Sequence, residues 1–192
     1  MLSNKLVMES DQAEKVLRKI EGSRRRGYLP IVGRKRGEEL AHIIRKVKPQ
    51  RILEVGTFVG YSTIMMGKEL GEGSEIVTIE IDPDEAEMAK ENIIMAELKV
   101  NVRVLTGDAI ELIPTVEGEI DMVFLDADKS EYLEYLKLVE PRLHKESVVV
   151  ADNAGSFTRS MEGYLEYVRD SGRYESEYID CGWDGLEVSV KK

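Results

Sequence analysis

Short buried runs alternate with helix-like stretches through the middle of the chain, and this alternation limits the fold more than any other feature. The runs are rich in β-branched and apolar residues, as strands buried on both faces are, and they cover residues 51–55, 75–80, 100–105, 120–125 and 147–151. The stretches between them cover residues 61–70, 83–96, 109–112 and 131–139. Strand, helix and strand in repetition predict a parallel sheet with helices on both faces.

The N-terminal part has a different pattern. Four apolar positions at helical spacing predict a first helix, and these are Val7, Val16, Leu17 and Ile20. Gly27 and Pro30 are expected to end this helix before a second one begins over residues 38–47. We therefore expect two helices ahead of the sheet.

The C-terminal part is predicted to complete the sheet. A helix at residues 161–169 precedes two strand-like runs, 174–179 and 186–190, and a Gly-containing turn between them predicts a hairpin at the sheet edge. The fold class is therefore α/β, with a doubly wound, mostly parallel seven-stranded sheet, an antiparallel C-terminal hairpin strand and N-terminal helices. A chain of 192 residues has the length of a single domain, in which residues 1–48 form a helical cap and residues 49–192 the α/β core.

Composition excludes several classes of protein. Apolar residues make up 42% and charged residues 33%, but no apolar run is long enough to span a bilayer, so a soluble protein without membrane association is expected. No apolar segment with a small-residue cleavage site follows Met1, which predicts a cytoplasmic location. Cys181 is the single cysteine, so the chain has neither a disulfide framework nor a cysteine metal cluster.

Charge is unevenly distributed along the chain. Residues 15–51 contain 13 Lys and Arg against 3 Asp and Glu, whereas the net charge of the whole chain is −10. The basic segment includes Arg24-Arg25-Arg26 and Arg34-Lys35-Arg36. These residues either meet an anionic substrate or a nucleic acid, or they form a solvated helical face with a loop.

Residues at the ends of the first three strands predict a nucleotide site, because ligands of open α/β sheets bind beyond the carboxyl ends of the strands. A loop bounded by Gly56 and Gly60 follows the first strand, and glycines there let the backbone bend and approach a ligand. Glu80 ends the second strand, where a carboxylate accepts the hydroxyls of a ribose. Asp108 and Ala109 follow the third and can border an adenine. Together they suit one adenosine.

The spacing of the glycines indicates which nucleotide. The loop reads Gly-x-x-x-Gly, not the Gly-x-Gly-x-x-Gly of a dinucleotide fold. Glu54, at the end of the first strand, would place negative charge where a pyrophosphate belongs. A cationic sulfonium ligand with an amino group tolerates that charge, so S-adenosylmethionine is favoured over NAD.

A second group of polar residues follows the fourth and fifth strands. Asp126, Asp152 and Asn153 carry hard oxygen donors, the ligands that Mg²⁺ prefers, although the same residue types also form turns and helix caps. Asp152 and Asn153 can share a cation only if the strand has ended before them, since neighbours in a strand point to opposite faces. Lys129 follows three residues after Asp126, and a lysine in a partly desolvated site can act as a general base.

With these residues identified, the chain resembles the cation-dependent catechol and caffeoyl-CoA O-methyltransferases, which have a Rossmann-like methyltransferase fold. The resemblance extends from about Pro30 to the C-terminus. It is carried by Leu53-Glu54-Val55-Gly56-Thr57-Phe58-Val59-Gly60-Tyr61-Ser62, Ile79-Glu80-Ile81-Asp82-Pro83, Gly107-Asp108-Ala109, Asp126 with Lys129, Asp152-Asn153 and Asp184-Gly185-Leu186.

The resemblance implies a role for each matching residue. The methionine end of the cofactor would be held by Val32, Gly56, Thr57, Gly60 and Ser62, the ribose by Glu80, and the adenine by Asp108 and Ala109. The divalent cation would be bound by Asp126, Asp152 and Asn153, with Asp126 also close to the cofactor. Lys129 matches the catalytic base proposed for the family.

Two departures from the family concern the substrate wall. The animal catechol enzymes carry a His-Trp pair between the metal aspartate and the lysine, where this chain has Ala127 and Asp128. After Asn153 the chain continues Ala154-Gly155-Ser156-Phe157 in place of the common Val-Leu-Trp type of sequence. The resemblance therefore predicts the chemistry more firmly than the acceptor.

The expected function is methylation of a hydroxyl on a small vicinal-diol or catechol-like acceptor, with S-adenosylmethionine as donor and Mg²⁺ as the expected cation. One alternative is a tRNA methyltransferase that acts on a hydroxylated nucleoside through the same site, which the basic segment favours and the net acidity opposes. Others are a nucleotide-binding domain without catalysis and an NAD-dependent reductase. A homodimer is expected, with the N-terminal helix as a dimer element.

Overall fold

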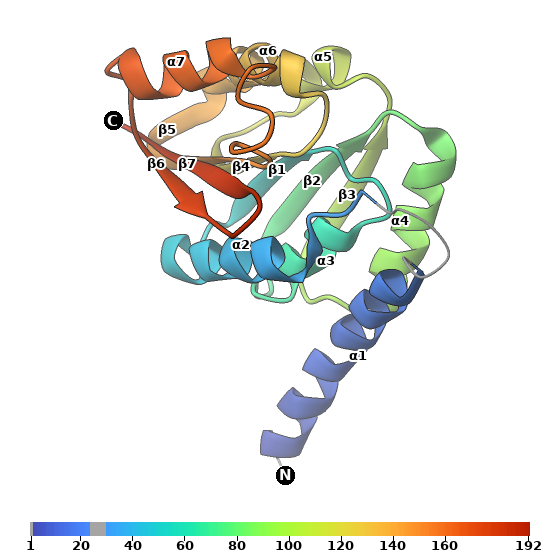
Figure 1. Ribbon diagram of the computed structural model, residues 1–192. Helices are drawn as coiled ribbons and strands as arrows, with labels where there is room; N and C mark the ends of the chain where they lie inside the picture. Colours follow the sequence, from blue (N-terminus) through green and yellow to red (C-terminus); the bar gives the residue numbers. More distant parts are fainter. Residues whose placement is uncertain (1, 24–29) are drawn as a thin grey trace.

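The strand-like runs form one seven-stranded sheet in the part of the chain that the computed structural model describes, residues 2–23 and 30–192 (Figure 1). The strands are β1 (Arg51–Val55), β2 (Glu75–Glu80), β3 (Asn101–Thr106), β4 (Ile120–Leu125), β5 (Leu143–Ala151), β6 (Tyr174–Asp180) and β7 (Gly185–Lys191). Their order across the sheet is β3-β2-β1-β4-β5-β7-β6. β1 to β5 are parallel, and β7 runs antiparallel between β5 and β6. The predicted fold class is confirmed.

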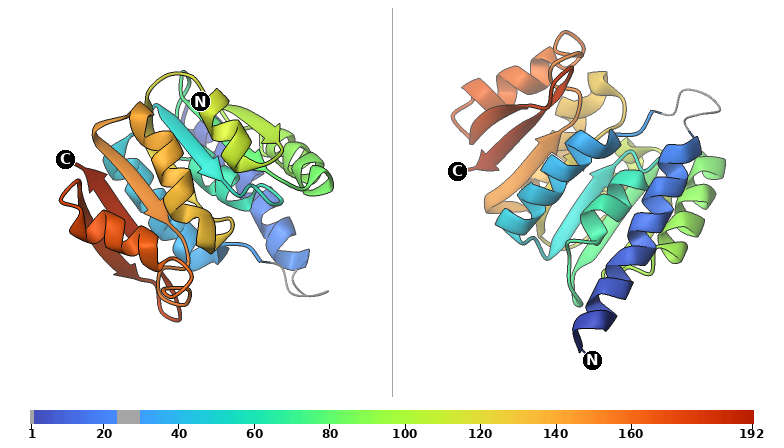
Figure 2. Two further views of the ribbon diagram at one scale, coloured as in Figure 1. Left: turned by 90° about the horizontal axis from the view of Figure 1, so that it is seen from above. Right: turned by 60° about the horizontal axis from the view of Figure 1, so that its bottom comes forward.

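The helices lie on both faces of the sheet, as the alternation predicts (Figures 1 and 2). They are α1 (Leu2–Ser23), α2 (Gly33–Val47), α3 (Tyr61–Gly67), α4 (Pro83–Met95), α5 (Ala109–Leu112), α6 (Tyr132–Val139) and α7 (Glu162–Asp170). Local sequence explains one start clearly: Pro83 occupies the first turn of α4, and the Asp82 carboxylate accepts hydrogen bonds from the Asp84 and Glu85 amides.

Two hydrophobic clusters, one on each face, follow from the period of two along the strands. Ile52 and Phe124 point to the face covered by the N-terminal helices, in the same cluster as Leu17 of α1 and Leu40 of α2. Their neighbours, such as Leu53, point to the opposite face, where α6 and α7 pack. Both faces of the central strands are therefore buried, which explains why their sequences are apolar almost throughout.

Helix α2 begins earlier than predicted. Its first turn contains Gly33, Arg34, Lys35 and Arg36, which lack apolar periodicity, so the sequence pattern indicated a start only at residue 38. The first turn is stabilised by an internal bond in which the Arg36 Nε donates to the Val32 carbonyl over 3.0 Å. The earlier start carries Arg36 to the carboxyl edge of the sheet.

Helix α1 packs beside α3 and α4 through Ala13, Val16, Leu17 and Ile20, and its N-terminal end extends away from the sheet (Figure 2). The helix ends at Ser23, and the predicted break at Gly27 and the basic run at 24–26 lie outside the described residues. None of the described helices is long and apolar enough to cross a membrane.

Candidate active site

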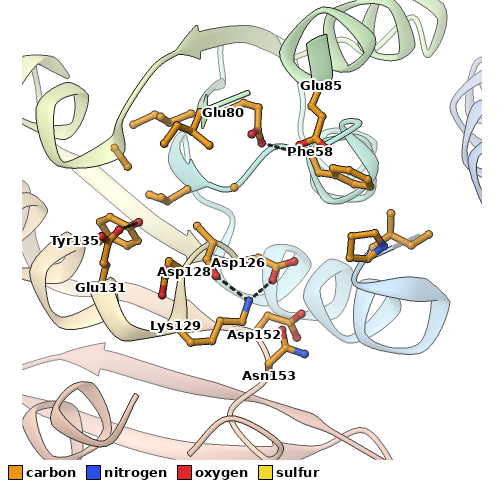
Figure 3. A pocket seen from close by; sticks show the side chains of 18 of the residues that line it. Phe58, Glu80, Glu85, Asp126, Asp128, Lys129, Glu131, Tyr135, Asp152 and Asn153 are labelled. Atoms are coloured by element: carbon orange, nitrogen blue, oxygen red, sulfur yellow. Dashed lines mark hydrogen bonds and ion pairs between the residues drawn. The ribbon is translucent and has the colours of Figure 1, made fainter. Parts of the chain in front are cut away.

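A cavity of about 690 Å³ opens at the carboxyl ends of β1 to β5, where the strand order reverses between β1 and β4 (Figure 3). Glu80, Asp108 and Ala109 line it at the β2 and β3 side. Asp126 and Asp152 line it at the β4 and β5 side. The topology thus brings both groups of predicted site residues to one cavity.

The glycine loop after β1 needs glycine for steric reasons. Gly56 has a φ of +97°, and a Cβ at this position would lie 2.2 Å from the Asp126 carbonyl oxygen. Gly60 also has a positive φ and immediately precedes α3. The loop therefore passes directly against the end of β4, so that the two predicted halves of the site share backbone contacts.

Glu80 is held in a fixed orientation at the end of β2. Its side chain is buried, and its two carboxylate oxygens accept hydrogen bonds from the Phe58 amide over 2.6 Å and the Asp82 amide over 3.0 Å. Asp108 is exposed and caps α5 by accepting from the Ile110 amide. These carboxylates face the end of the cavity at which an adenosine was predicted.

Glu54 lies beneath the loop and is not part of the cavity wall. It is fully buried, and its carboxylate accepts hydrogen bonds of 2.5 Å from the Ser62 and Thr63 hydroxyls. Burial raises the pKa of Glu54 to about 7, although these hydroxyls oppose the rise. Glu54 therefore fixes the start of α3 from below.

The residues predicted for the methionine end gather around a small cleft of about 30 Å³ next to the main cavity. Val32, Gly56, Thr57 and Ser62 line it together with Asp126. The Thr57 hydroxyl is buried and hydrogen-bonded to the Thr78 hydroxyl over 2.6 Å. Gly60 lines neither the main cavity nor the small cleft, and its contribution is to the turn that precedes α3.

At the other end of the main cavity, two carboxylates lie at the ends of adjacent strands, the buried Asp152 and the partly buried Asp126. The Asp152 amide donates to the Leu125 carbonyl, which places Asp152 beside Asp126. β5 ends at Ala151, and Asn153 adopts a left-handed φ of 63°. The condition for Asp152 and Asn153 to face one site, that the strand has ended, is therefore met.

The guanidinium group of Arg36 contacts Asp152, one of these two carboxylates. Arg36 Nη1 is 2.7 Å from Asp152 Oδ1 and 2.8 Å from Oδ2, and all these atoms are buried. Burial and the charge of Asp126 raise the pKa of Asp152, and Arg36 opposes the rise. Burial likewise raises the pKa of Asp126, against the effect of Lys129. Two carboxyl groups with raised pKa values thus lie together, and a cation close by favours their charged forms.

Lys129 supplies a second positive charge. Its Nζ donates to Asp126 Oδ1 over 2.9 Å and to the Ala127 carbonyl over 3.0 Å (Figure 3). The ammonium also lies 5.5 Å from the ring centre of Tyr132. Two of its three hydrogens are engaged, which leaves the third for an oxygen bound in the cavity.

Sequence comparison assigns the chain to a family. A family model described as O-methyltransferase matches residues 8–166. The chain belongs to the O-methyltransferase family. Catechol O-methyltransferase B of Danio rerio is 34% identical over 180 residues, which are 87% of this chain and 67% of the relative. Catechol O-methyltransferase of Sus scrofa is 34% identical over 174 residues, which are 84% of this chain and 92% of the relative.

Solved structures agree with this assignment. The O-methyltransferase TomG of Streptomyces achromogenes, solved in complex with SAM, is 28% identical with a TM-score of 0.78, and the match covers 92% of this chain and 89% of TomG. The predicted resemblance to the O-methyltransferases is confirmed. The NAD-dependent reductase considered from the sequence does not fit this family.

Two residues of the O-methyltransferase site were missed in the sequence. Arg36 was counted only as part of a basic run, and a buried partner for it could not be read from the sequence because Asp152 lies 116 residues away. Asp184 accepts from Asn153 Nδ2 over 2.9 Å and from the Gly155, Ser156 and Gly185 amides. Although burial opposes it, these hydrogen bonds lower the pKa of Asp184. Its place in the Asp184-Gly185-Leu186 motif was the available signal.

The donor set of the O-methyltransferase fits a hard divalent cation. The described residues contain no cluster of three His, Cys, Asp or Glu side chains suited to a metal, so the predicted site depends on two carboxylates and one amide. Asp184 accepts a hydrogen bond from the amide nitrogen of Asn153, so the amide oxygen of Asn153 points away from Asp184. Asp126, Asp152 and this oxygen are the ligand types that Mg²⁺ takes alongside water and substrate oxygens.

Proposed function

We propose that this O-methyltransferase transfers the methyl group of S-adenosylmethionine to one hydroxyl of a small vicinal-diol or catechol-like acceptor, with help from a divalent cation. The observation that supports the proposal most directly is the division of one cavity into two ends. One end carries Glu80 and Asp108, which suit an adenosine, and the other carries Asp126, Asp152 and Asn153, which suit a cation and its bound oxygens.

The proposed role of the nucleotide end is to bind and orient the donor. Bound S-adenosylmethionine would supply an electrophilic methyl group on its sulfonium. Glu80, already oriented by two amides, accepts the ribose hydroxyls without reorganising. The Gly56–Gly60 loop lets the backbone approach the methionine part, while Val32 and Ser62 border it. The TomG complex with SAM supports this use of the fold.

The proposed role of the acidic end is to prepare the acceptor oxygen. A divalent cation held by Asp126, Asp152 and Asn153 would supply Lewis acidity that favours the ionised hydroxyl. As an ammonium, Lys129 donates a hydrogen bond with its remaining hydrogen to the ionised acceptor oxygen; only in its neutral form, with a free electron pair on Nζ, would it take the hydroxyl proton itself. Asp126 also borders the small cleft at the methionine end, so it links acceptor and donor. Holding both reactants in register supplies much of the rate acceleration.

The tRNA alternative has less support. Arg34 pairs with Glu14 and Glu21, and Arg36 pairs with Asp152, so both arginines of the 34–36 run are engaged within the protein. Lys35 remains exposed. We therefore prefer a small acceptor. Methyl transfer to bulk tRNA with a rate that falls steeply as the salt concentration rises would favour the tRNA alternative instead.

We also propose a domain organisation and an oligomeric state for the protein. Residues 1–48 and 49–192 act as cap and core of a single domain, since α1 and α2 share one hydrophobic cluster with the sheet. The part of α1 that extends from the sheet is the element we propose for a homodimer (Figure 2). Sedimentation of the full chain and of a chain starting after α1 would test this.

The experiment for the function is a methyl-transfer screen with labelled S-adenosylmethionine. Acceptors are catechol, phenol, a vicinal aliphatic diol, a phenolic thioester and bulk tRNA, each with and without a chelator followed by Mg²⁺. We expect transfer to catechol and none to phenol, because phenol lacks the second oxygen for the cation. We expect the chelator to abolish transfer and Mg²⁺ to restore it. Equal transfer to phenol, or full activity after exhaustive chelation, would contradict the role of the cation.

A further inference from the structure

The acceptor end of the cavity has an aromatic wall that the sequence motifs do not indicate. Trp183, in the turn between β6 and β7, and Phe157, after β5, both line the cavity. Positions 127 and 128, between Asp126 and Lys129, are Ala and Asp and add no ring to the wall. Aromatic surface at this end of the cavity therefore comes from elements far along the chain.

Trp183 is held on one side and exposed on the other. The Arg36 guanidinium carbon lies 5.4 Å from the centre of the indole ring, and the same guanidinium is fixed by both oxygens of Asp152. Even so, 75% of the Trp183 surface is exposed. The indole ring thus lies against Arg36, which itself contacts the candidate cation ligand Asp152, and most of the ring surface is available for a ligand.

The turn that carries Trp183 is well anchored. The Cys181 amide donates to the Asp184 carbonyl over 3.0 Å, and the Gly182 amide donates to the Asp180 carboxylate over 2.7 Å. Asp184 binds amides of the segment after β5 and also the side chain of Asn153. The indole and the candidate cation ligand Asn153 are therefore positioned through the same residue.

Charge at this end disfavours an anionic acceptor. Arg36 and Lys129 are each paired with an aspartate, and Asp128 and Glu131 add further negative charge to the cavity wall. An acceptor that carries a carboxylate or a phosphate, including a thioester of a nucleotide, would meet no unpaired cationic side chain among the described residues of the wall. A neutral planar ring gains from stacking without that penalty.

We propose that Trp183 is the residue on which the aromatic ring of the acceptor stacks, so that it selects neutral catechols over aliphatic diols. This inference rests on the proposed function for the position of the acceptor oxygens. Trp183 is a specificity-determining residue here, and the transfer step itself depends on Lys129 and Asp126.

The first test uses fluorescence, because Trp183 is the single tryptophan of the chain. Catechol is titrated into the protein with Mg²⁺ and S-adenosylhomocysteine, with excitation where only indole absorbs. We expect saturable quenching by catechol and none by a vicinal aliphatic diol. Absence of quenching by catechol at concentrations that saturate turnover, or at its solubility limit if no turnover occurs, would overturn the proposal.

The second test compares Trp183→Ala, Trp183→Phe and Ile94→Ala. Ile94 matches Trp183 in exposure at 75% and lies on α4 outside the cavity. We expect Trp183→Ala to raise KM for catechol about tenfold, with kcat and the affinity for S-adenosylmethionine little changed, and Trp183→Phe to restore most of the loss. An unchanged KM would overturn the proposal. A wild type that transfers methyl groups to no acceptor would instead contradict the proposed function, while the titration still tests the stacking.

Discussion

At the residue scale, two buried charged groups distinguish this site from a passive cavity. Glu54 is closed beneath the glycine loop with uncharged hydroxyl groups as its partners, and Asp152 is paired with the Arg36 guanidinium. Hydrogen bonds and ion pairs only partly offset the cost of removing such groups from water. The free energy of unfolding therefore depends on their protonation and on their partners. Each therefore gives a measurable prediction.

Glu54 should make folding depend on pH. Its pKa is about 7 in the folded protein against an ordinary 4.5, so the stabilisation by its protonated form is complete below pH 4.5 and is lost as pH rises to 7. Glu54→Gln removes this titration. The free energy of unfolding of the variant, relative to wild type, should rise by about 3 kcal/mol between pH 4.5 and pH values above 7. Urea titrations across this range measure it, and parallel curves would contradict the pKa shift.

Arg36 should stabilise the fold by neutralising Asp152. In Arg36→Met the buried carboxylate loses its partner, which costs about 3–5 kcal/mol for a pair of this kind. Because a divalent cation would compensate the same charge, Mg²⁺ should raise the melting temperature of this variant more than that of wild type. Arg45→Met is the control, since Arg45 lies on the same helix in an exposed pair with Glu69. Equal stability of the two variants would show that the Asp152 pair contributes little.

Arg36 also illustrates what the sequence could and could not predict. Asp126, Asp152, Asn153 and Glu80 could be predicted to lie together because they stand at or just after strand ends, and strand ends converge in a parallel sheet. Arg36 follows no strand, and its pairing depends on how α2 packs across the sheet. A three-dimensional contact of this kind leaves no periodic signal in the chain.

At the element scale, the loop from Gly56 to Gly60 joins the two halves of the site. Its pattern and position were predicted correctly, but its contact with the Asp126 backbone could not be, because that distance depends on the pairing of β1 with β4. Similarly, α2 began earlier than its apolar pattern indicated, because its first turn is fixed by Arg36 and not by apolar packing. Tertiary contacts thus set the details that periodicity leaves open.

Gly56→Ala should damage the site more than its size suggests. The new Cβ would meet the Asp126 carbonyl at 2.2 Å in addition to the strain of a positive φ. Gly73→Ala carries a similar φ of +90° with no atom within 4 Å, so it should cost only about 1–2 kcal/mol. We expect Gly56→Ala to lose more stability than this and to bind S-adenosylmethionine weakly in calorimetric titration. Equal behaviour of both variants would mean that the loop can move away from β4.

At the scale of the whole molecule, the reversal of strand order creates one cavity with two chemically different ends. The end proposed for the donor is built from β1, β2 and β3, and the end proposed for the acceptor from β4, β5 and the β6–β7 turn. The catechol O-methyltransferases of Danio rerio and Sus scrofa align with most of this chain, which supports the proposed chemistry. Asp152 and Glu80 belong to opposite ends and neither lines the small cleft, so a change at one is predicted to leave binding at the other intact.

The most direct measurement is therefore a comparison of Asp152→Ala and Glu80→Gln in two assays, calorimetric binding of S-adenosylmethionine and methyl transfer to catechol with Mg²⁺. We predict that Asp152→Ala lowers transfer about 100-fold or more while its cofactor affinity stays within about twofold of wild type. We predict that Glu80→Gln weakens cofactor binding about tenfold or more. Undiminished transfer by Asp152→Ala, with saturating cofactor in both proteins, would contradict the account.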